Sequence, residues 1–217
     1  MSMALIAAVL SYGQAPIEDA CSRSYHSPEQ VADYVRLALD GDPDAISELL
    51  AGLPDSHERI CVVLRLAGLV CPEKPQLRPV LTRALSDIWD HHDMMLLMHA
   101  LSASRAAFVA LCDLGAPPDV SDLPQLVRVY RGGGDARAVA RGMSWSLDPT
   151  VAEFFARQRV TSLGSYCADR TGPSCVVEAK VDRSAIVLRV DSREEAEVIL
   201  RRAPRRIALY GGEEKAA

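Results

Sequence analysis

The first half of the chain places its apolar residues with the period of an α-helix. In "HSPEQVADYVRLALDG", one side of the helix would carry Val31, Tyr34, Val35, Ala38 and Leu39. Ser27 stands where a cap is expected, Pro28 takes the first helical position, and Gln30 completes a capping box. The pattern therefore predicts a helix that begins at Pro28 and ends at Gly41.

The same period continues toward the middle of the chain. Asp42 and Pro43 repeat the start signal for a second helix. Three longer helices are predicted at about 56–70, 76–90 and 93–114. The opening stretch "MSMALIAAVLSYGQA" fits a first helix or a strand, and it lacks the basic residues that begin a signal peptide.

After "GAPPDVSDLP" the period changes from that of a helix to that of a β-strand. Strands are predicted at 126–131, 175–181, 185–190, 196–200 and 206–210. Between them, Asp148 and Pro149 start a helix that carries Val151, Phe154 and Phe155 on one face. At this helical spacing the two phenylalanines are expected in the core, with stacking on an aromatic ligand as the alternative.

These patterns predict an α+β protein with a helical region at 1–120 and a β-containing region at 121–217. The chain has 217 residues, of which 49% are hydrophobic, so a sizeable core can form. Residues 1–120 carry 8 Lys and Arg against 16 Asp and Glu, whereas residues 121–217 carry 16 against 13. The basic half suits an anionic ligand and the acidic half a basic partner. Alternatively, the two halves complement each other across an internal contact.

The six cysteines are scattered and form no CxxC pair, which favours reduced thiols in the cytoplasm. Cys167 and Cys175 are an alternative disulfide pair. No stretch has the apolar length of a membrane span, so no membrane association is expected.

The segment "HHDMMLLMH" brings together His91, His92, Asp93 and His99. Metal ligands on a helix usually stand three or four residues apart and need a further ligand. Neither feature is found, so no metal site is predicted. We interpret the segment instead as the start of a helix with a buried or surface histidine. The arginines of "LRRAPRRIALY" are interrupted by alanine and proline, which favours a solvated turn over a nucleic-acid surface.

One strand ends on a charged side chain. In "LVRVYR", alternation puts Val127, Val129 and Arg131 on one side. An arginine on the core-facing side is expected at the rim of the core, where a cleft opens and its guanidinium can meet phosphate or carboxylate oxygens. The glycines that follow, 132–134, would let a ligand approach the backbone closely. By itself this signal is weak, because most arginines at strand ends are surface residues.

Two further short segments carry polar side chains at a spacing of two. In "MSWSLDP", Ser144 and Ser146 share one face of an extended segment and Trp145 takes the other. In "DSREEAEVIL", Glu195 and Glu197 share one face at the edge of a strand. Two carboxylates so close repel each other, which raises the pKa of one of them unless cations lie nearby. A solvated charged turn is the alternative.

The three pieces stand in an order that resembles the arginine-serine-glutamate class of mono-ADP-ribosyltransferases, the cholera-toxin-like group. They are "YRG" at 130–132, "SWS" at 144–146 and "EAE" at 195–197. The resemblance covers about residues 125–210 and leaves the first 120 unexplained. It departs from the family at Trp145, where threonine is usual. The resemblance implies an ADP-ribosyltransferase-like split β-sheet domain and NAD as substrate.

The resemblance also implies roles on the NAD side of the site. Tyr130, Arg131 and Gly132 would bind NAD, with Arg131 on the phosphates or the adjacent ribose and the backbone of Gly132 on the carboxamide. Ser144 would orient the carboxylate of Glu197. Glu197 would bond the nicotinamide-ribose hydroxyl and stabilise the positive charge that develops as nicotinamide leaves.

On the acceptor side, the resemblance implies that Glu195 meets the nucleophile, as in members that modify protein arginine. The acceptor is then a macromolecule, with protein favoured over nucleic acid, and the helical region binds the target or a regulator. Two alternatives remain open, namely an NAD glycohydrolase with water as acceptor and a non-catalytic helical adaptor.

Overall fold

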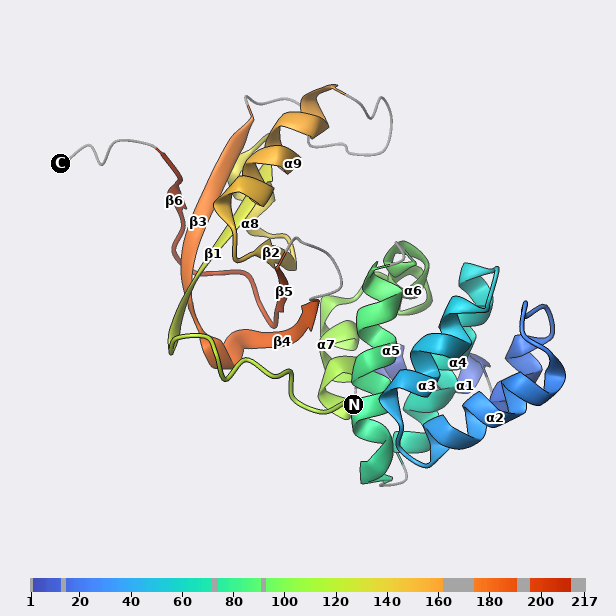
Figure 1. Cartoon of the computed structure of the whole chain (residues 1–217). Helices are drawn as coiled ribbons and strands as arrows, with labels where there is room; N and C mark the ends of the chain where they lie inside the picture. Colours follow the sequence, from blue (N-terminus) through green and yellow to red (C-terminus); the bar gives the residue numbers. More distant parts are fainter. Residues whose placement is uncertain are drawn as a thin grey trace. The chain divides into compact units, whose positions relative to one another are not determined.

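The computed structural model of the chain describes residues 2–12, 15–71, 74–90, 93–161, 174–190 and 196–211. The chain divides into two compact units, Met1–Pro118 and Asp119–Ala217. The first is helical over residues 3–115, and the second is a six-stranded antiparallel sheet with interspersed helices (Figure 1). The fold is therefore α+β. No helix in the described ranges combines the length and apolarity needed to cross a membrane.

The helical unit is built around one buried helix. Its helices are α1 (Met3–Tyr12), α2 (Pro28–Leu39), α3 (Pro43–Ala51), α4 (Ser56–Val70), α5 (Arg78–Asp90), α6 (Met94–Ala100) and α7 (Arg105–Leu114), with short 3₁₀ turns η1 (Ile17–Cys21) and η2 (Pro75–Leu77). Helix α4 contacts α1, α5, α6, α7 and η1. Apolar side chains on most sides of α4 are buried for this reason.

The predicted start of α2 is confirmed in detail. The Ser27 hydroxyl accepts a hydrogen bond from the Gln30 N–H at 3.3 Å, and the Gln30 side chain accepts one from the Ser27 N–H at 2.9 Å. Asp42 likewise caps α3 by accepting from the Asp44 N–H at 2.9 Å. Gly41, which separates the two helices, has φ of +103°, a conformation that favours glycine.

The single helix predicted at 93–114 is wrong, because the chain forms α6 and α7 with a break between them. Ser102 and Ala103 take left-handed backbone conformations with φ of 55° and 52°. Ser104 then accepts a hydrogen bond from the Ala107 N–H at 3.2 Å and caps α7. The apolar period runs through this break, so periodicity alone does not reveal it.

The sheet unit contains the five predicted strands and the expected short extended segment. The strands are β1 (Leu126–Gly133), β2 (Ser144–Ser146), β3 (Cys175–Asp182), β4 (Ile186–Val190), β5 (Glu197–Leu200) and β6 (Ala208–Leu209). Their order in the sheet is β4-β5-β2-β1-β3-β6. Every neighbouring pair is antiparallel.

The sheet turns between β1 and β2. These strands share one register pair, Tyr130 with Ser146, whereas β1 and β3 pair along their whole length. Figure 1 shows β1 and β3 running steeply while β2 and β4 run across them. The core of this unit takes buried side chains from both sets of strands, including Val129, Val177 and Val198.

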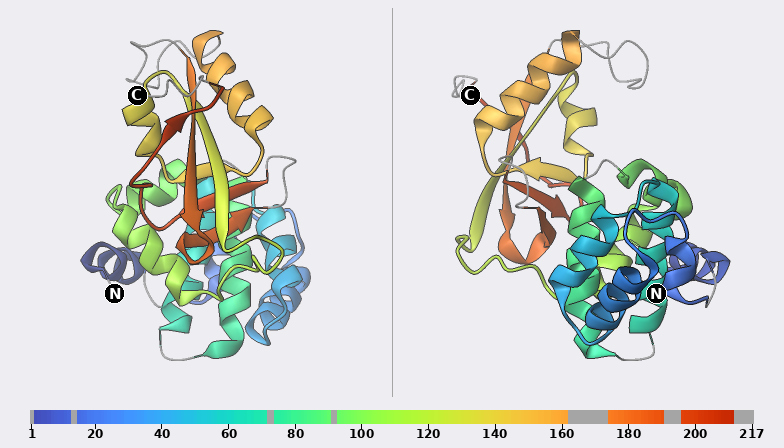
Figure 2. Two further views of the ribbon diagram at one scale, coloured as in Figure 1. Left: turned by 90° about the vertical axis from the view of Figure 1, so that its left-hand side faces the viewer. Right: turned by 45° about the vertical axis from the view of Figure 1, so that its right-hand side comes forward.

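Two helices pack on opposite sides of β1, namely α8 (Ala136–Ala140) and α9 (Pro149–Thr161) (Figure 2). Gly132 of the strand faces α9, and the next residue, Gly133, faces α8. A Cβ on Gly132 would lie 1.9 Å from the carbonyl oxygen of Ala152 in α9, and one on Gly133 would lie 2.3 Å from the Val139 side chain in α8. Helix α8 was not predicted from the sequence.

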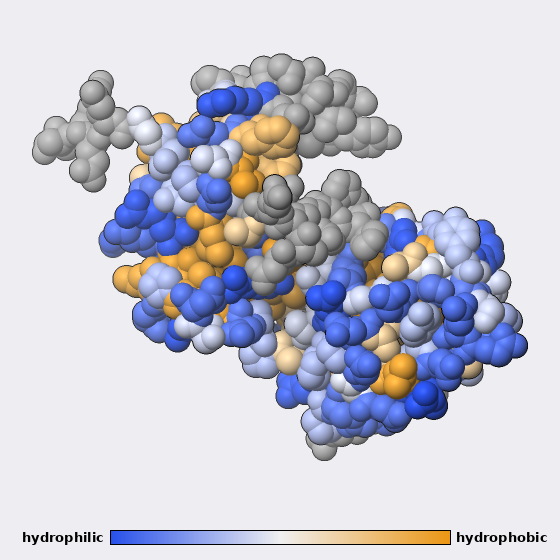
Figure 3. Space-filling model, in the orientation of Figure 1, coloured by the Kyte–Doolittle hydropathy of each residue, from blue (hydrophilic) through white to orange (hydrophobic). Residues whose placement is uncertain are grey.

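The expectation that Phe154 and Phe155 lie in the core is wrong, since they are 54% and 36% exposed. Ala152 and Ala156 form the buried face of α9 instead. The backbone of α9 comes too near β1 for a larger side chain between them. Phe154 and Phe155 are thus among the exposed large hydrophobic residues of this unit, and Figure 3 shows that apolar residues lie at the surface on one of its faces.

Candidate functional site

Strand β2 lies between β1 and β5 and sets the geometry of the site. Ser146 stands opposite Tyr130 on one side and opposite Glu197 on the other. Residues opposite each other in a ladder point to the same face of the sheet. Ser144, Ser146 and Glu197 therefore share one face, and Trp145 points to the other.

Ser144 and Glu197 are in direct contact. The Ser144 hydroxyl donates a hydrogen bond to Oε1 of Glu197. The glutamate is only 8% exposed, although it is a charged residue type. Buried carboxylates require hydrogen bonds or cations, and the hydroxyl supplies one such bond. The bond also fixes the direction in which the carboxylate points.

Arg131 reaches the same segment from β1, on the face of the sheet that carries Val129 and Trp145 rather than Ser144 and Glu197. Val127 and Val129 are buried on its side of the strand, and Arg131 itself is half-buried, as expected for a residue at the rim of the core. Its Nη1 donates a hydrogen bond to the main-chain carbonyl of Ser144. The guanidinium is thus tied to the backbone of β2. Its expected contact with the NAD phosphates stays a prediction.

Gly142 is part of this arrangement and was not singled out from the sequence. A Cβ on it would lie 2.2 Å from Nε and 2.3 Å from Cζ of Arg131, so the guanidinium rests directly on the glycine backbone. The Gly142 carbonyl accepts a hydrogen bond from the indole N–H of Trp145 at 3.1 Å. The only signal in the sequence is an isolated glycine shortly before the serine segment.

Trp145 acts as a packing residue, as predicted from alternation. It is 1% exposed and belongs to the core of the sheet unit. Its bulk lies on the face opposite the Ser144 hydroxyl. The departure from the threonine of the resembled family therefore leaves the contact between Ser144 and Glu197 intact.

Tyr130 and the two glycines after Arg131 lie against protein. The Tyr130 ring is buried with Ala152 and Ala156 of α9, and its centroid lies 5.1 Å from that of Tyr210. The sides of Gly132 and Gly133 that lack a Cβ face α9 and α8. Close approach by these helices, rather than by a ligand, explains why glycine is needed at both positions.

The turn into β5 holds the backbone next to Glu197 in an uncommon conformation. Ala196 has φ of +42°, in the left-handed region where a side chain is disfavoured. Its carbonyl accepts a hydrogen bond from the Leu147 N–H at 2.9 Å, which ties the turn to the end of β2. Glu195, the predicted acceptor-side residue, lies outside the described residues.

The described residues of the histidine-rich segment belong to the helical unit. Asp93 is buried and pairs with Arg59, with 2.7 Å between its Oδ2 and Nε of the arginine. His99 lies in α6, and His91 and His92 lie outside the described residues, as does Cys167. Within the described part of the chain, no three His, Cys, Asp or Glu side chains form a group that could hold a metal ion.

The arrangement combines a buried carboxylate, a hydroxyl that orients it and a guanidinium that fixes the backbone of the hydroxyl residue. A carboxylate held in this way offers preorganised negative charge to a positive centre beside it. Comparisons of the chain with protein-family models, with curated proteins and with the solved structures found no significant match.

Proposed function

We propose that the chain is a mono-ADP-ribosyltransferase, which cleaves NAD between nicotinamide and ribose and transfers ADP-ribose to a macromolecular acceptor. One observation carries the proposal. Arg131, Ser144 and Glu197 come from three different strands, and they are joined by hydrogen bonds from the guanidinium to the Ser144 carbonyl and from the Ser144 hydroxyl to Glu197. These are the three residues on which the resemblance rests.

The reaction needs negative charge at the sugar carbon that loses nicotinamide. When the C1′–N bond breaks, both electrons leave with nicotinamide, which departs as a neutral molecule, and the ribosyl group takes oxocarbenium character as in glycoside cleavage. In the proposal, Glu197 is the catalytic residue that faces this positive charge. The acceptor then forms the new bond to C1′ and loses a proton.

Ser144 and Arg131 act as positioning residues for that carboxylate. The hydroxyl bond holds Oε1 in one direction, and the guanidinium holds the main chain from which the hydroxyl projects. Preorganised charge stabilises a transition state because no reorganisation is needed as the reaction proceeds. Arg131 and the basic excess of residues 121–217 also suit the pyrophosphate of NAD.

The turn of the sheet agrees with the split sheet that the resemblance implies. A single register pair joins β1 to β2, so the strands fall into one set of β1, β3 and β6 and another of β2, β4 and β5. Ser144 and Glu197 belong to one set and Arg131 to the other. In the proposal, NAD binds where the two sets meet.

The experiment is incubation of the purified chain with NAD labelled in the adenylate part, with and without a cell lysate. We expect nicotinamide release and label on protein. Glu197→Gln should lower nicotinamide release by at least about 10²-fold. Glu178→Gln is the matched control, because Glu178 stands opposite Tyr130 on the same sheet face but on β3.

Free ADP-ribose without labelled macromolecules would assign the chain as an NAD glycohydrolase instead. Nicotinamide release that persists unchanged in Glu197→Gln would overturn the enzymatic proposal and favour a non-catalytic adaptor with a contaminating activity. Circular dichroism of both variants checks that each keeps its fold.

A further inference from the structure

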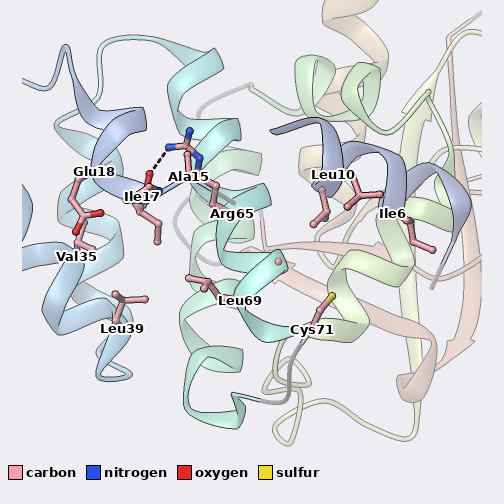
Figure 4. Close-up of a pocket in the computed structure, with 13 residues that line it drawn as sticks. Ile6, Leu10, Ala15, Ile17, Glu18, Val35, Leu39, Arg65, Leu69 and Cys71 are labelled. Atoms are coloured by element: carbon pink, nitrogen blue, oxygen red, sulfur yellow. Dashed lines mark hydrogen bonds between the residues drawn. The ribbon is translucent and has the colours of Figure 1, made fainter. Parts of the chain in front are cut away.

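The helical unit contains a pocket of about 730 Å³ between α1, η1, α2 and the end of α4 (Figure 4). Its walls are mainly aliphatic and include Ile6, Val9, Leu10, Val35, Leu39 and Leu69. Pockets of this volume with apolar walls and a few polar groups are typical of small-molecule sites. The pocket lies outside the unit that carries Arg131, Ser144 and Glu197.

One wall of the pocket carries a cation, Arg65 of α4. Its Nη1 donates a hydrogen bond to the carbonyl of Pro16 at 2.7 Å, which fixes the guanidinium at the η1 end of the pocket (Figure 4). Its Nε is shielded from solvent and has no hydrogen-bond partner among the described residues. Because Nε is shielded, a ligand would meet the terminal nitrogens of the guanidinium, which carry its other donors.

Glu18 is the other charged residue at the pocket. It is exposed, and Figure 4 shows its carboxylate directed toward Val35, away from the guanidinium. Apart from these two charged residues and Cys71, the pocket is lined by apolar residues and Gly68. Arg65 is half-buried, and charge-assisted hydrogen bonds gain strength where water screens them less.

From these contacts we propose that the pocket binds an amphipathic carboxylate, with the carboxylate on Arg65 and an alkyl chain along the aliphatic walls. An alkyl chain matches the walls contributed by α1, α2 and α4. A planar carboxylate matches the donor fork of a guanidinium. This inference concerns the helical unit and does not depend on the proposed transferase activity.

The test compares dodecanoate with dodecanol, which share an alkyl chain and differ at the head group. Binding to the full chain is measured by isothermal titration calorimetry below the concentration at which dodecanoate forms micelles. We expect saturable binding of one dodecanoate per chain, at least about tenfold tighter than dodecanol. Arg65→Met should remove that preference and leave dodecanol binding unchanged. Arg36→Met is the matched control, because Arg36 is exposed on α2 and does not line the pocket.

A second variant and a chemical readout test the location. Ala15→Trp should fill the pocket and weaken both ligands. Cys71 is exposed and lines the same pocket, so bound dodecanoate should slow its alkylation by iodoacetamide. Equal affinity for the two ligands, absence of saturable binding, or an unchanged preference in Arg65→Met would overturn the proposal. If Arg65→Met does not fold, the proposal is tested by comparing the affinities of the two ligands for the unaltered chain and for Ala15→Trp.

Discussion

The hydroxyl of Ser144 donates a hydrogen bond to the carboxylate of Glu197, although 53 positions separate the two residues in the sequence. The contact exists because β2 pairs with β5 in a register that sets Ser146 opposite Glu197. A slip of one residue would turn the glutamate to the other face of the sheet. The register of two short strands thus determines the geometry of the candidate site.

The first prediction concerns Ser144→Ala. Glu197 would keep its charge but lose the bond that orients it, so we expect kcat for nicotinamide release to fall by about 10- to 100-fold, less than in Glu197→Gln. KM for NAD should change little. Ser121→Ala, which alters an exposed serine of the same unit, is the control. Unchanged kcat in Ser144→Ala would contradict the positioning role.

The second prediction concerns Gly142→Ala. The added Cβ would overlap the guanidinium of Arg131, which must then leave the Ser144 carbonyl. We expect activity to fall about as far as in Arg131→Ala. The double variant should be no less active than Arg131→Ala alone, because the two changes remove the same contact.

Gly68→Ala serves as a glycine control in the helical unit, since a Cβ there would approach only the Val9 side chain, at 3.3 Å. If the losses of activity in Gly142→Ala and Arg131→Ala add up in the variant that carries both changes, Gly142 and Arg131 act separately.

A third prediction concerns Gly132→Ala. Its Cβ would overlap backbone atoms of α9, which cannot move aside as a flexible side chain would. We expect the free energy of unfolding to fall by about 1–3 kcal/mol, as for other overpacked sites. Urea denaturation followed by tryptophan fluorescence, to which Trp89 and Trp145 both contribute, measures the change. A stability equal to that of the unaltered chain would mean that α9 lies farther from β1.

The fourth prediction concerns the dependence of stability on pH. Asp148 accepts hydrogen bonds from the hydroxyl and the N–H of Thr150 at the start of α9, and these bonds lower the pKa of its carboxyl below 3.8. A carboxyl with a lowered pKa in the folded state stabilises the fold above its unfolded pKa, and the contribution is lost as pH falls through the folded value. Asp148→Asn should therefore be less stable than the unaltered chain at neutral pH, and the difference should shrink below about pH 4.

Thr150→Val provides the matched variant, because it removes the hydroxyl donor and keeps the carboxyl. The pKa of Asp148, measured by NMR titration, should rise toward 3.8 in this variant. An unchanged pKa would show that the hydroxyl bond does not hold the carboxyl in its charged form.

Features encoded by neighbouring residues were predictable from the sequence. The capping box at Ser27 and the strand that ends near Arg131 follow from residues close together in the chain. The break at Ser102 and Ala103 was missed because neither residue is a glycine, although both take left-handed conformations. The exposure of Phe154 was missed because it follows from a tertiary contact, the approach of α9 to Gly132.

In the candidate site, too, some features were predictable from neighbouring residues and others depend on tertiary structure. Alternation within "SWS" predicted that the Ser144 hydroxyl and the Trp145 ring point to opposite faces, as they do. The bond from Arg131 to the Ser144 carbonyl and the role of Gly142 depend on the turn between β1 and β2. No local pattern in the sequence encodes that turn.

The junction of β1 with β2 has a mechanical consequence. Only the pair of Tyr130 and Ser146 connects these strands in register, so few main-chain bonds resist a change in the angle between them. The side chain of Arg131 extends from β1 across the junction and donates a hydrogen bond to the main chain of β2. It therefore works as a tether that supplements the shared core, and without it only that core and the single register pair would hold the two sets of strands together at this junction.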